Sequence, residues 1–289
     1  MTTQKRARLK SLAHGRPHTA KPPASLSSKA TRTLIRTHHL LEKRRKQALS
    51  EGNDAAATRL TREIDAHGGI RTYQAASLLG QGNDRGGDSS KVLMDWLKPL
   101  RSILKARGDG DRLRLLEVGA LSTNNICSRS GLFDIERIDL NSQAEGILQQ
   151  DFMKRPIPKS ISHKFDIISL SLVLNYVPDP VGRGEMLKHT LKFMRLSPDE
   201  DGQLRAIRPC LFLVLPAPCI TNSRYMDEFR LEAIMKSFGY VKMQQKLSNK
   251  LVYYLWKADD LRPEKRFEGF KKVELRAGTK RNNFAIVVR

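Results

Sequence analysis

Cysteine is scarce in this chain, and its positions follow no familiar ligand spacing. The 3 residues, Cys127, Cys210 and Cys219, include no C-x-x-C pair. This argues against a disulfide framework and a zinc site and fits a reducing compartment. The 7 histidines give no metal-ligand spacing either. Long apolar runs are also missing: none reaches the roughly 20 residues that span a bilayer, and the first residues lack the apolar core of a secretion signal. We therefore expect neither a resident metal nor a membrane as partner.

Acidic residues are few relative to basic ones. The chain carries 52 Lys and Arg against 30 Asp and Glu, a formal net charge of +22. Such an excess predicts a polyanionic partner, most simply nucleic acid. The alternative is a basic targeting tail on a protein that binds no nucleic acid.

The charge imbalance is strongest at the N-terminus. Thirteen Lys and Arg and a single acid, Glu42, fall within the first 50 residues. Residues 1–27 are also rich in Ser and Pro, and we expect them to form a disordered basic tail. The clusters at 5–8 and 43–46 suit import into the nucleus and nucleolus, or contact with RNA phosphates. Residues 43–46 also fit a solvated helix face.

Helical patterns dominate up to residue 108. Helices are predicted at 28–49 and 55–66, and a third piece at 70–79 precedes the glycine-rich loop 80–88. Ser89 is the expected cap of a further helix, whose apolar stripe runs through residues 92–104. We group 28–108 as an N-terminal helical domain, joined through a hinge at 109–111 to a second domain, 112–289.

The second domain alternates strands with helices, which predicts a three-layer α/β architecture. Strands are expected at 115–118, near 138–140, near 150, at 164–174 and at 211–215, with helices at 182–196 and 223–238. The last of these helices should turn Met226, Phe229, Ile234 and Met235 inward. No long helix separates the apolar segments 250–256 and 284–288, so we expect them to pair as an antiparallel hairpin.

The stretch around Gly119 is the centre of the functional argument. Gly119 follows an apolar strand that contains Glu117, and Asp139 comes twenty residues later, after a second strand. This is the arrangement in which a glycine turn and an acid bind a nucleotide and its ribose. Leu121 and Asn124 replace the second and third glycines of the usual motif. The motif alone therefore fits an ordinary α/β turn equally well.

Together with an acid after the third strand and the antiparallel end, these features resemble the class I S-adenosylmethionine-dependent methyltransferases. The resemblance implies a Rossmann-like fold with a mostly parallel seven-stranded sheet that ends in an antiparallel hairpin. It also implies S-adenosyl-L-methionine as cofactor. By the same resemblance the cofactor contacts comprise Glu117, Gly119, Asp139, Leu140, Asp151, Phe152, Ser169 and Leu170. Asp139 would bind the ribose and Asp151 the adenine amino group, with Phe152 beside the ring.

Three further segments resemble the fungal 25S ribosomal RNA adenine-N1 methyltransferases. They are Tyr73–Ser77, Gly80–Lys91 and Ser171–Pro178. The resemblance implies methylation of N1 of an adenine in large-subunit rRNA, with the rRNA or a pre-60S particle as partner. From the basic clusters we expect a nucleolar protein, and we expect it to be a monomer. A similar animal protein senses S-adenosylmethionine in growth signalling, so a non-enzymatic sensor is the alternative. A protein methyltransferase is a further one.

The resemblance also suggests roles at the transfer site. Asn175 and Tyr176 stand where related enzymes carry a polar residue followed by an aromatic one, so Asn175 would accept from the adenine amino group and Tyr176 would stack on the base. The usual Pro-Pro between them is missing, and a turn Asn with a core Tyr is the structural alternative. We expect Tyr73, Gln74 and Arg85 to belong to a lid over the cofactor, with Arg85 on an acid or on the cofactor carboxylate.

Overall fold

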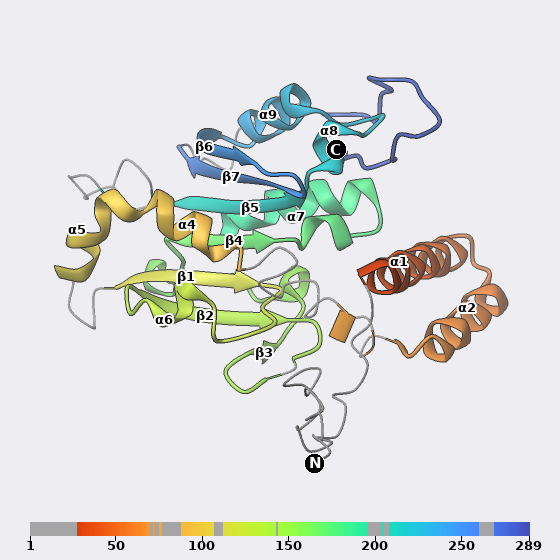
Figure 1. Cartoon of the computed structure of the whole chain (residues 1–289), viewed down its shortest axis with the longest axis horizontal. Helices are drawn as coiled ribbons and strands as arrows, with labels where there is room; N and C mark the ends of the chain where they lie inside the picture. The colour runs from red at the N-terminus through yellow and green to blue at the C-terminus, as the bar shows by residue number, and fades with distance from the viewer. Residues whose placement is uncertain are drawn as a thin grey trace, which may run out of the picture.

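The computed structural model describes residues 28–69, 72, 75–76, 88–106, 112–142, 144–195, 204, 208–259 and 269–289. Its centre is a seven-stranded sheet in the order β3-β2-β1-β4-β5-β7-β6 (Figure 1). The strands are β1 (Leu113–Val118), β2 (Phe133–Asp139), β3 (Leu148–Gln149), β4 (Ile167–Ser171), β5 (Cys210–Pro216), β6 (Tyr240–Leu247) and β7 (Leu251–Ala258). The first five pair in parallel, and β7 pairs antiparallel with both β5 and β6. The predicted fold class is confirmed.

The closing hairpin is built from a different strand than the sequence suggested. β7 pairs with β6, whereas residues 284–288 join no strand of the sheet; Val288 forms only an isolated bridge with Phe270. β6 is an edge strand on which Tyr240 alone is buried. Its polar composition hid it from pattern analysis. The Phe284–Val288 segment is apolar because it packs against the domain core: Phe284, Ala285, Ile286 and Val288 are buried.

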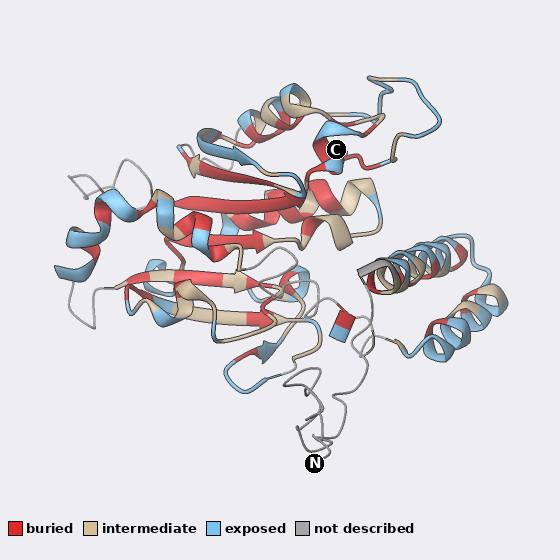
Figure 2. Cartoon of the chain, viewed as in Figure 1, coloured by how far each residue is buried: buried red, intermediate tan, exposed pale blue. Residues whose placement is uncertain are grey.

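Helices cover both faces of the sheet. On one face pack α4 (Ser90–Trp96), η2 (Lys98–Leu100), α5 (Arg101–Ala106) and α6 (Ile126–Arg129). On the other face pack α7 (Pro180–Phe193), α8 (Pro218–Thr221) and α9 (Glu228–Ser237), together with the C-terminal segment. Short 3-10 turns are η4 (Phe152–Lys154), η5 (Ile161–His163) and η6 (Leu174–Tyr176). Figure 2 shows the central strands buried between these layers. Residues 90–106, grouped above with the helical domain, thus pack on the sheet.

The predicted burial is wrong for one residue of the helix expected at 223–238, which the structure shows as α9 (Glu228–Ser237). Met226, Ile234 and Met235 are buried as expected, but Phe229 is 85% exposed. The helix begins only at Glu228, because Asp227 caps it by accepting from the backbone N of Arg230 at 2.9 Å. Leu231, Ile234 and Met235 are fully buried on one face at i, i+3 and i+4 spacing, and Phe229 lies about 200° away from Leu231 around the helix, on the outer face.

The N-terminal part is a helical hairpin of α1 (Ser28–Ser50) and α2 (Asp54–Ala66), which confirms both predicted helices. Asn53 caps α2 by accepting from Ala56 N at 3.0 Å. The two helices pack through small and apolar side chains, among them Leu41 and Ile64. In Figure 1 the hairpin is set apart from the sheet, on the side toward which β1 and β2 point. The third helix at 70–79, the 80–88 loop and the 109–111 hinge fall mostly or wholly outside the described residues.

Two kinds of feature are absent from the residues that the structure describes. No helix there combines the length and apolar character that crossing a membrane requires. No group of three or more His, Cys, Asp or Glu in this part of the chain has the arrangement of a metal site.

Candidate active site

The carboxyl ends of β1, β2 and β4 meet at one edge of the sheet. Val118 is in register with Ile138 of β2 and with Leu170 of β4. The backbone N–H groups of Gly119 and Ala120 both donate to the carbonyl of Ile138, at 2.8 and 3.1 Å. The sequence-predicted residues Gly119 and Asp139 are therefore neighbours, at the edge where ligands bind in open α/β sheets.

Gly119 occupies a position that a residue with a side chain would not fit. Its φ is +75°, in the left-handed region that L-residues rarely adopt. A Cβ there would also lie 2.5 Å from Cγ2 of Val173, in the turn after β4. Glycine is thus required both by its own backbone and by the close approach of the β4 turn, which brings the ends of β1 and β4 together.

Glu117 is a partly exposed carboxylate held just below this turn. Its Oε1 and Oε2 accept from Nδ2 of Asn125 at 2.8 and 3.1 Å, and Arg137 Nε lies 4.0 Å away. Asn125 is fixed in turn, because its Oδ1 caps α6 by accepting from Ser128 N at 2.7 Å. Burial raises the pKa of Glu117, against the lowering effects of Asn125 and Arg137. A cationic group that came close would reverse that rise.

The segment 88–90 ties the helical side of the molecule to this edge. Asp88 accepts from Ser90 N through Oδ1 at 2.9 Å and from Ile126 N through Oδ2 at 2.6 Å. One carboxylate therefore serves the starts of both α4 and α6. Ser90 Oγ accepts from Cys127 N at 3.1 Å. Sequence analysis missed the role of Asp88, although an acid directly before a capped apolar stripe is a recognisable signal.

The expected cap at Ser89 is not made. Ser89 occupies the N-cap position of α4 but forms no side-chain capping bond. Asp88, one residue earlier, already accepts from the helix start. The Ser89 hydroxyl instead lies 2.7 Å from the Ser171 hydroxyl at the end of β4. This bond brings the 88–90 segment against the same sheet edge.

The acid at the end of β2 has an apolar neighbour in solvent. Asp139 Oδ1 accepts from Asn141 N at 2.8 Å, which orders the turn. Leu140, the residue after Asp139, is 67% exposed. The side chain is available to cover one face of a flat ligand.

The residues after β3 have largely structural contacts. Asp151 caps η4, with its Oδ1 accepting from Met153 N at 2.9 Å. Phe152 is 3% exposed and packs its ring against His189 and Phe193, with centroids 5.1 and 5.3 Å away. The ring of Phe152 thus lies in the core, below the sheet edge.

The end of β4 is strained and carries a buried acceptor without a partner. Ser169 and Leu170 are buried strand residues that support the edge from beneath. Leu172 follows with φ +58°, a conformation that costs a non-glycine residue about 1–3 kcal/mol. In η6, Oδ1 of Asn175 is buried without a hydrogen-bond partner among the described residues. Strain next to an unsatisfied polar atom is typical of a ligand site.

Tyr176 follows Asn175 in the same turn. Its backbone N–H donates to the carbonyl of Val173 at 2.9 Å, and the residue is partly exposed. The expected lid residues Tyr73, Gln74 and Arg85 lie outside the described residues.

The sheet has the order β3-β2-β1-β4-β5-β7-β6, with a glycine turn after β1, an acid at the end of β2 and an antiparallel β7. These features define the fold of the class I S-adenosylmethionine-dependent methyltransferases. Among solved structures, the CurJ carbon methyltransferase matches 81% of this chain and 71% of its own, at 14% identity and a TM-score of 0.40. The fold assignment rests on the strand order itself.

Comparison of sequences is more specific. The family described as 25S rRNA (adenine(2142)-N(1))-methyltransferase, Bmt2, matches residues 58–286. The 25S rRNA adenine-N(1) methyltransferase of Schizosaccharomyces pombe is 39% identical over 253 residues, which are 88% of this chain and 89% of that protein. The 25S rRNA (adenine(2142)-N(1))-methyltransferase of Saccharomyces cerevisiae is 36% identical over 88% of this chain and 71% of its own. The chain belongs to this family.

Proposed function

We propose that this protein transfers a methyl group from S-adenosylmethionine to N1 of an adenine in large-subunit rRNA. The observation that carries the proposal is the meeting of Gly119, Asp139 and the β4 turn at one sheet edge, in a member of this family. The net charge of +22 is in keeping with an RNA substrate.

The residues at the edge fit the cofactor. Glu117, whose pKa is raised by burial, would accept from the ammonium group of the methionine part and regain its ionised form there. Asp139 would accept from the ribose hydroxyls, and exposed Leu140 would cover the adenine ring. Asp151 would reach the adenine amino group. S-adenosylmethionine, when bound, would supply a methyl group activated by a positively charged sulfur, so that a neutral nitrogen could accept the methyl without prior deprotonation.

The protein's task in such a reaction is alignment rather than proton removal. Adenine N1 already has a lone pair, so no strong base is needed, and the enzyme gains rate by positioning the base and excluding water. Because N1 lies on the Watson–Crick edge, the target must be unpaired or flipped out.

Asn175 and Tyr176 are the residues proposed to hold the target base. The unpartnered Oδ1 of Asn175 would accept from the adenine amino group and stabilise the positive charge that the base acquires on methylation. Tyr176 would stack on the ring. These contacts keep N1 facing the methyl group.

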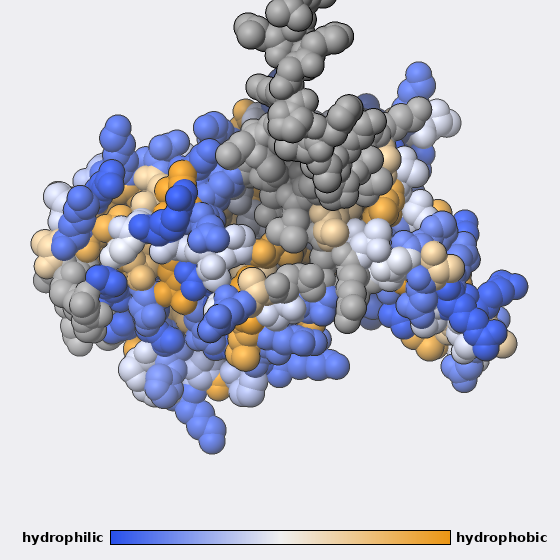
Figure 3. All heavy atoms as spheres, turned by 60° about the horizontal axis from the view of Figure 1, so that its bottom comes forward, coloured by the Kyte–Doolittle hydropathy of each residue, from blue (hydrophilic) through white to orange (hydrophobic). Residues whose placement is uncertain are grey.

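The surroundings of the site are proposed to bind RNA and close over the cofactor. Lys43, Arg44 and Lys46 are exposed on α1, and Figure 3 shows hydrophilic residues over much of the helical hairpin. They would contact RNA phosphates. Tyr73, Gln74 and Arg85 are proposed lid residues. We further propose that the protein acts as a monomer in the nucleolus, on the rRNA or a pre-60S particle.

The test is transfer of labelled methyl from S-adenosylmethionine to unmodified large-subunit rRNA, followed by digestion and nucleoside chromatography. Wild type and Asp139→Ala are compared at equal concentration. We expect the label in 1-methyladenosine with wild type and its loss in the variant. Label in another nucleoside would contradict N1 of adenine as the target. Absence of label from both rRNA and pre-60S particles, with cofactor binding intact, would favour the non-enzymatic sensor.

A further inference from the structure

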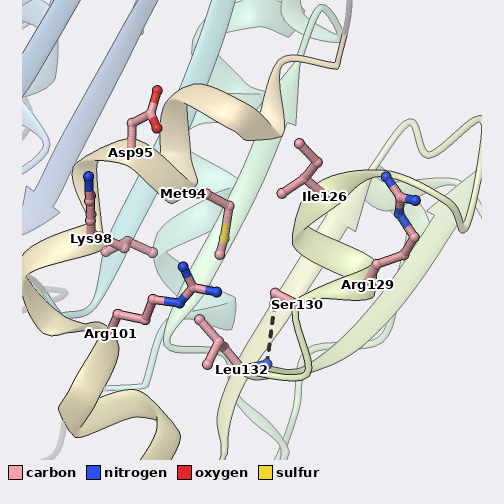
Figure 4. A pocket seen from close by; sticks show the side chains of 9 residues that line it. Met94, Asp95, Lys98, Arg101, Ile126, Arg129, Ser130 and Leu132 are labelled. Atoms are coloured by element: carbon pink, nitrogen blue, oxygen red, sulfur yellow. Dashed lines mark hydrogen bonds between the residues drawn. The ribbon is translucent and has the colours of Figure 1, made fainter.

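The described residues form a pocket of about 490 Å³ on the flank of the sheet, between α4, η2 and α5 on one side and α6 on the other (Figure 4). Its lining is part apolar and part charged. The apolar residues are Met94, Leu97, Ile126 and Leu132, and the polar ones are Asp95, Lys98, Arg101, Arg129 and Ser130. None of these side chains is among the proposed contacts to the cofactor or the target base.

The pocket is positively charged. Lys98, Arg101 and Arg129 face a single acid, Asp95. No carboxylate of the described residues lies within ion-pair distance of the three cations. In Figure 4 the guanidinium of Arg101 projects across the pocket toward Met94, with Lys98 and Arg129 on opposite sides. Three cations around one acid leave an excess of positive charge in the pocket, and a bound anion would reduce the repulsion between them.

The pocket is connected to the sheet edge through two helices. Ile126 lines it, and the backbone N–H of Ile126 is held by Asp88, next to the Asn125–Glu117 pair. α4 starts beside Ser171 and runs from there toward Lys98, roughly 12 Å further along a helix axis. An RNA strand that leaves the target site would thus reach the pocket within a few nucleotides.

We propose that this pocket binds the sugar–phosphate backbone of a single-stranded RNA segment that flanks the target adenine. The inference rests on the proposed RNA methyltransferase function. The volume suits a group of one nucleotide rather than a duplex. Arg101 can pair with a phosphate through two N–H groups or stack on a base. The base or the sugar can pack against the apolar side chains of Met94 and Leu132.

The test compares the rRNA affinity of a variant that lacks the three positive charges of the pocket with that of a variant that lacks three positive charges elsewhere. The pocket variant combines Lys98→Gln, Arg101→Gln and Arg129→Gln. The control combines Lys159→Gln, Lys192→Gln and Lys246→Gln, three exposed cations outside the pocket. Affinity for unmodified large-subunit rRNA is measured at several salt concentrations, and the S-adenosylmethionine affinity and the thermal midpoint are measured on the same proteins.

We expect the pocket variant to bind rRNA on the order of 10- to 100-fold more weakly, while the control changes about twofold or less. The slope of log affinity against log salt should become shallower by roughly 2 in the pocket variant, at about 0.7 for each lost contact with a single strand. Cofactor affinity should not change. Equal losses in the two variants would overturn the pocket as a specific site.

A second variant tests whether RNA enters the pocket. Met94→Trp fills the space without changing charge, and we expect it to raise the KM for rRNA while kcat stays near wild type. Unchanged rRNA affinity in a stably folded Met94→Trp protein would overturn the proposal.

Two other outcomes distinguish a failure of the proposed function from a failure of the pocket proposal. If wild type itself binds no rRNA, the proposed function fails. If the pocket variant binds naked rRNA normally and loses affinity only for pre-ribosomal particles, the occupant is a protein and the RNA proposal is overturned.

Discussion

The two ends of the parallel strands differ in the partners of their buried acceptor groups. At the amino end, Asp166 accepts from Arg208 Nη1 at 2.9 Å and from Arg114 N at 2.8 Å. The Asp166 and Arg208 side chains are only 2% and 4% exposed. At the carboxyl end, burial raises the pKa of Glu117, and Asn175 Oδ1 has no partner among the described residues.

This difference separates stability from function. A buried carboxylate with an opposite charge beside it has its partner within the fold, whereas a buried acceptor without a hydrogen bond costs free energy until a ligand supplies one. The left-handed backbone of Leu172 adds strain at the carboxyl end only. We infer that the amino end holds the sheet together and that the carboxyl end is organised for a cofactor and a base.

The largest effect is expected at the amino end. Asp166→Ala should lower the free energy of unfolding by about 3–5 kcal/mol, because it leaves the Arg208 charge buried without its carboxylate. Urea denaturation measures the change, with Asp134→Ala, an exposed acid 3.5 Å from Arg114, as the control. Cofactor affinity of the folded protein should not change. A loss below about 1 kcal/mol would contradict a stabilising role for the amino end.

Asn175→Ala should have the opposite signature. Removing a buried acceptor without a partner should leave the free energy of unfolding unchanged or slightly higher, since no described bond is lost. We expect kcat for methyl transfer to fall on the order of 10²-fold, as when one preorganised polar group is removed from an active site. Cofactor affinity should stay near wild type. Unchanged turnover would remove Asn175 from the mechanism.

Glu117→Gln should weaken S-adenosylmethionine binding by roughly 10- to 100-fold, because a charge-assisted hydrogen bond to the cofactor's ammonium group contributes about 1.5–3 kcal/mol. Without cofactor, the variant should be as stable as wild type or more so, since the ionised side chain is disfavoured by burial. Calorimetric titration and thermal unfolding measure the two effects. A variant that is much less stable yet binds normally would give Glu117 a structural role.

The raised pKa of Glu117 predicts that both the stability of the fold and the affinity for the cofactor depend on pH. Because its pKa is raised in the folded protein, the fold retains a proton there that the unfolded chain has released. The contribution of Glu117 to unfolding free energy should therefore decrease as pH rises from the ordinary carboxyl range through the raised pKa. Cofactor affinity should change in the other direction and weaken as pH falls through that pKa. Glu117→Gln should remove both dependences.

The smallest effect is expected for Ser171→Ala. It removes the 2.7 Å bond to Ser89, which joins the 88–90 segment to β4, and should cost about 0.5–1.5 kcal/mol of stability. Ser162→Ala is the matched control, since the exposed Ser160–Ser162 hydroxyl pair has the same 2.7 Å distance. We expect the control to change stability by less than half as much. Equal effects would show that the Ser89–Ser171 contact has no special role.

Much of this fold could be predicted from local patterns in the sequence. The apolar strand before Gly119, the acid at Asp139 and the helices α1 and α2 were predicted because burial and capping leave short-range signals. β6 was missed because an edge strand needs only one buried residue, Tyr240, and its remaining positions are polar. The apolar segment 284–288 was misassigned because burial under α7 and burial in a sheet produce the same composition.

Long-range geometry was beyond the sequence. That Val173 occupies the Cβ position of Gly119, or that Asp88 bridges the starts of two helices, depends on segments far apart in the chain. The exposed ring of Phe229 shows that an apolar residue alone does not reveal which way its side chain faces. The charged pocket between α4 and α6 likewise joins residues without a common motif.

We claim that the carboxyl ends of β1, β2 and β4 hold S-adenosylmethionine. Calorimetric titration of wild type and Asp139→Asn with the cofactor tests it most directly, with the thermal midpoint as a check of folding. Asn keeps the Oδ1 that accepts from Asn141 N, so the turn should persist. We predict at least a 10-fold loss of affinity with an unchanged thermal midpoint. Equal affinity in the two proteins would contradict the claim.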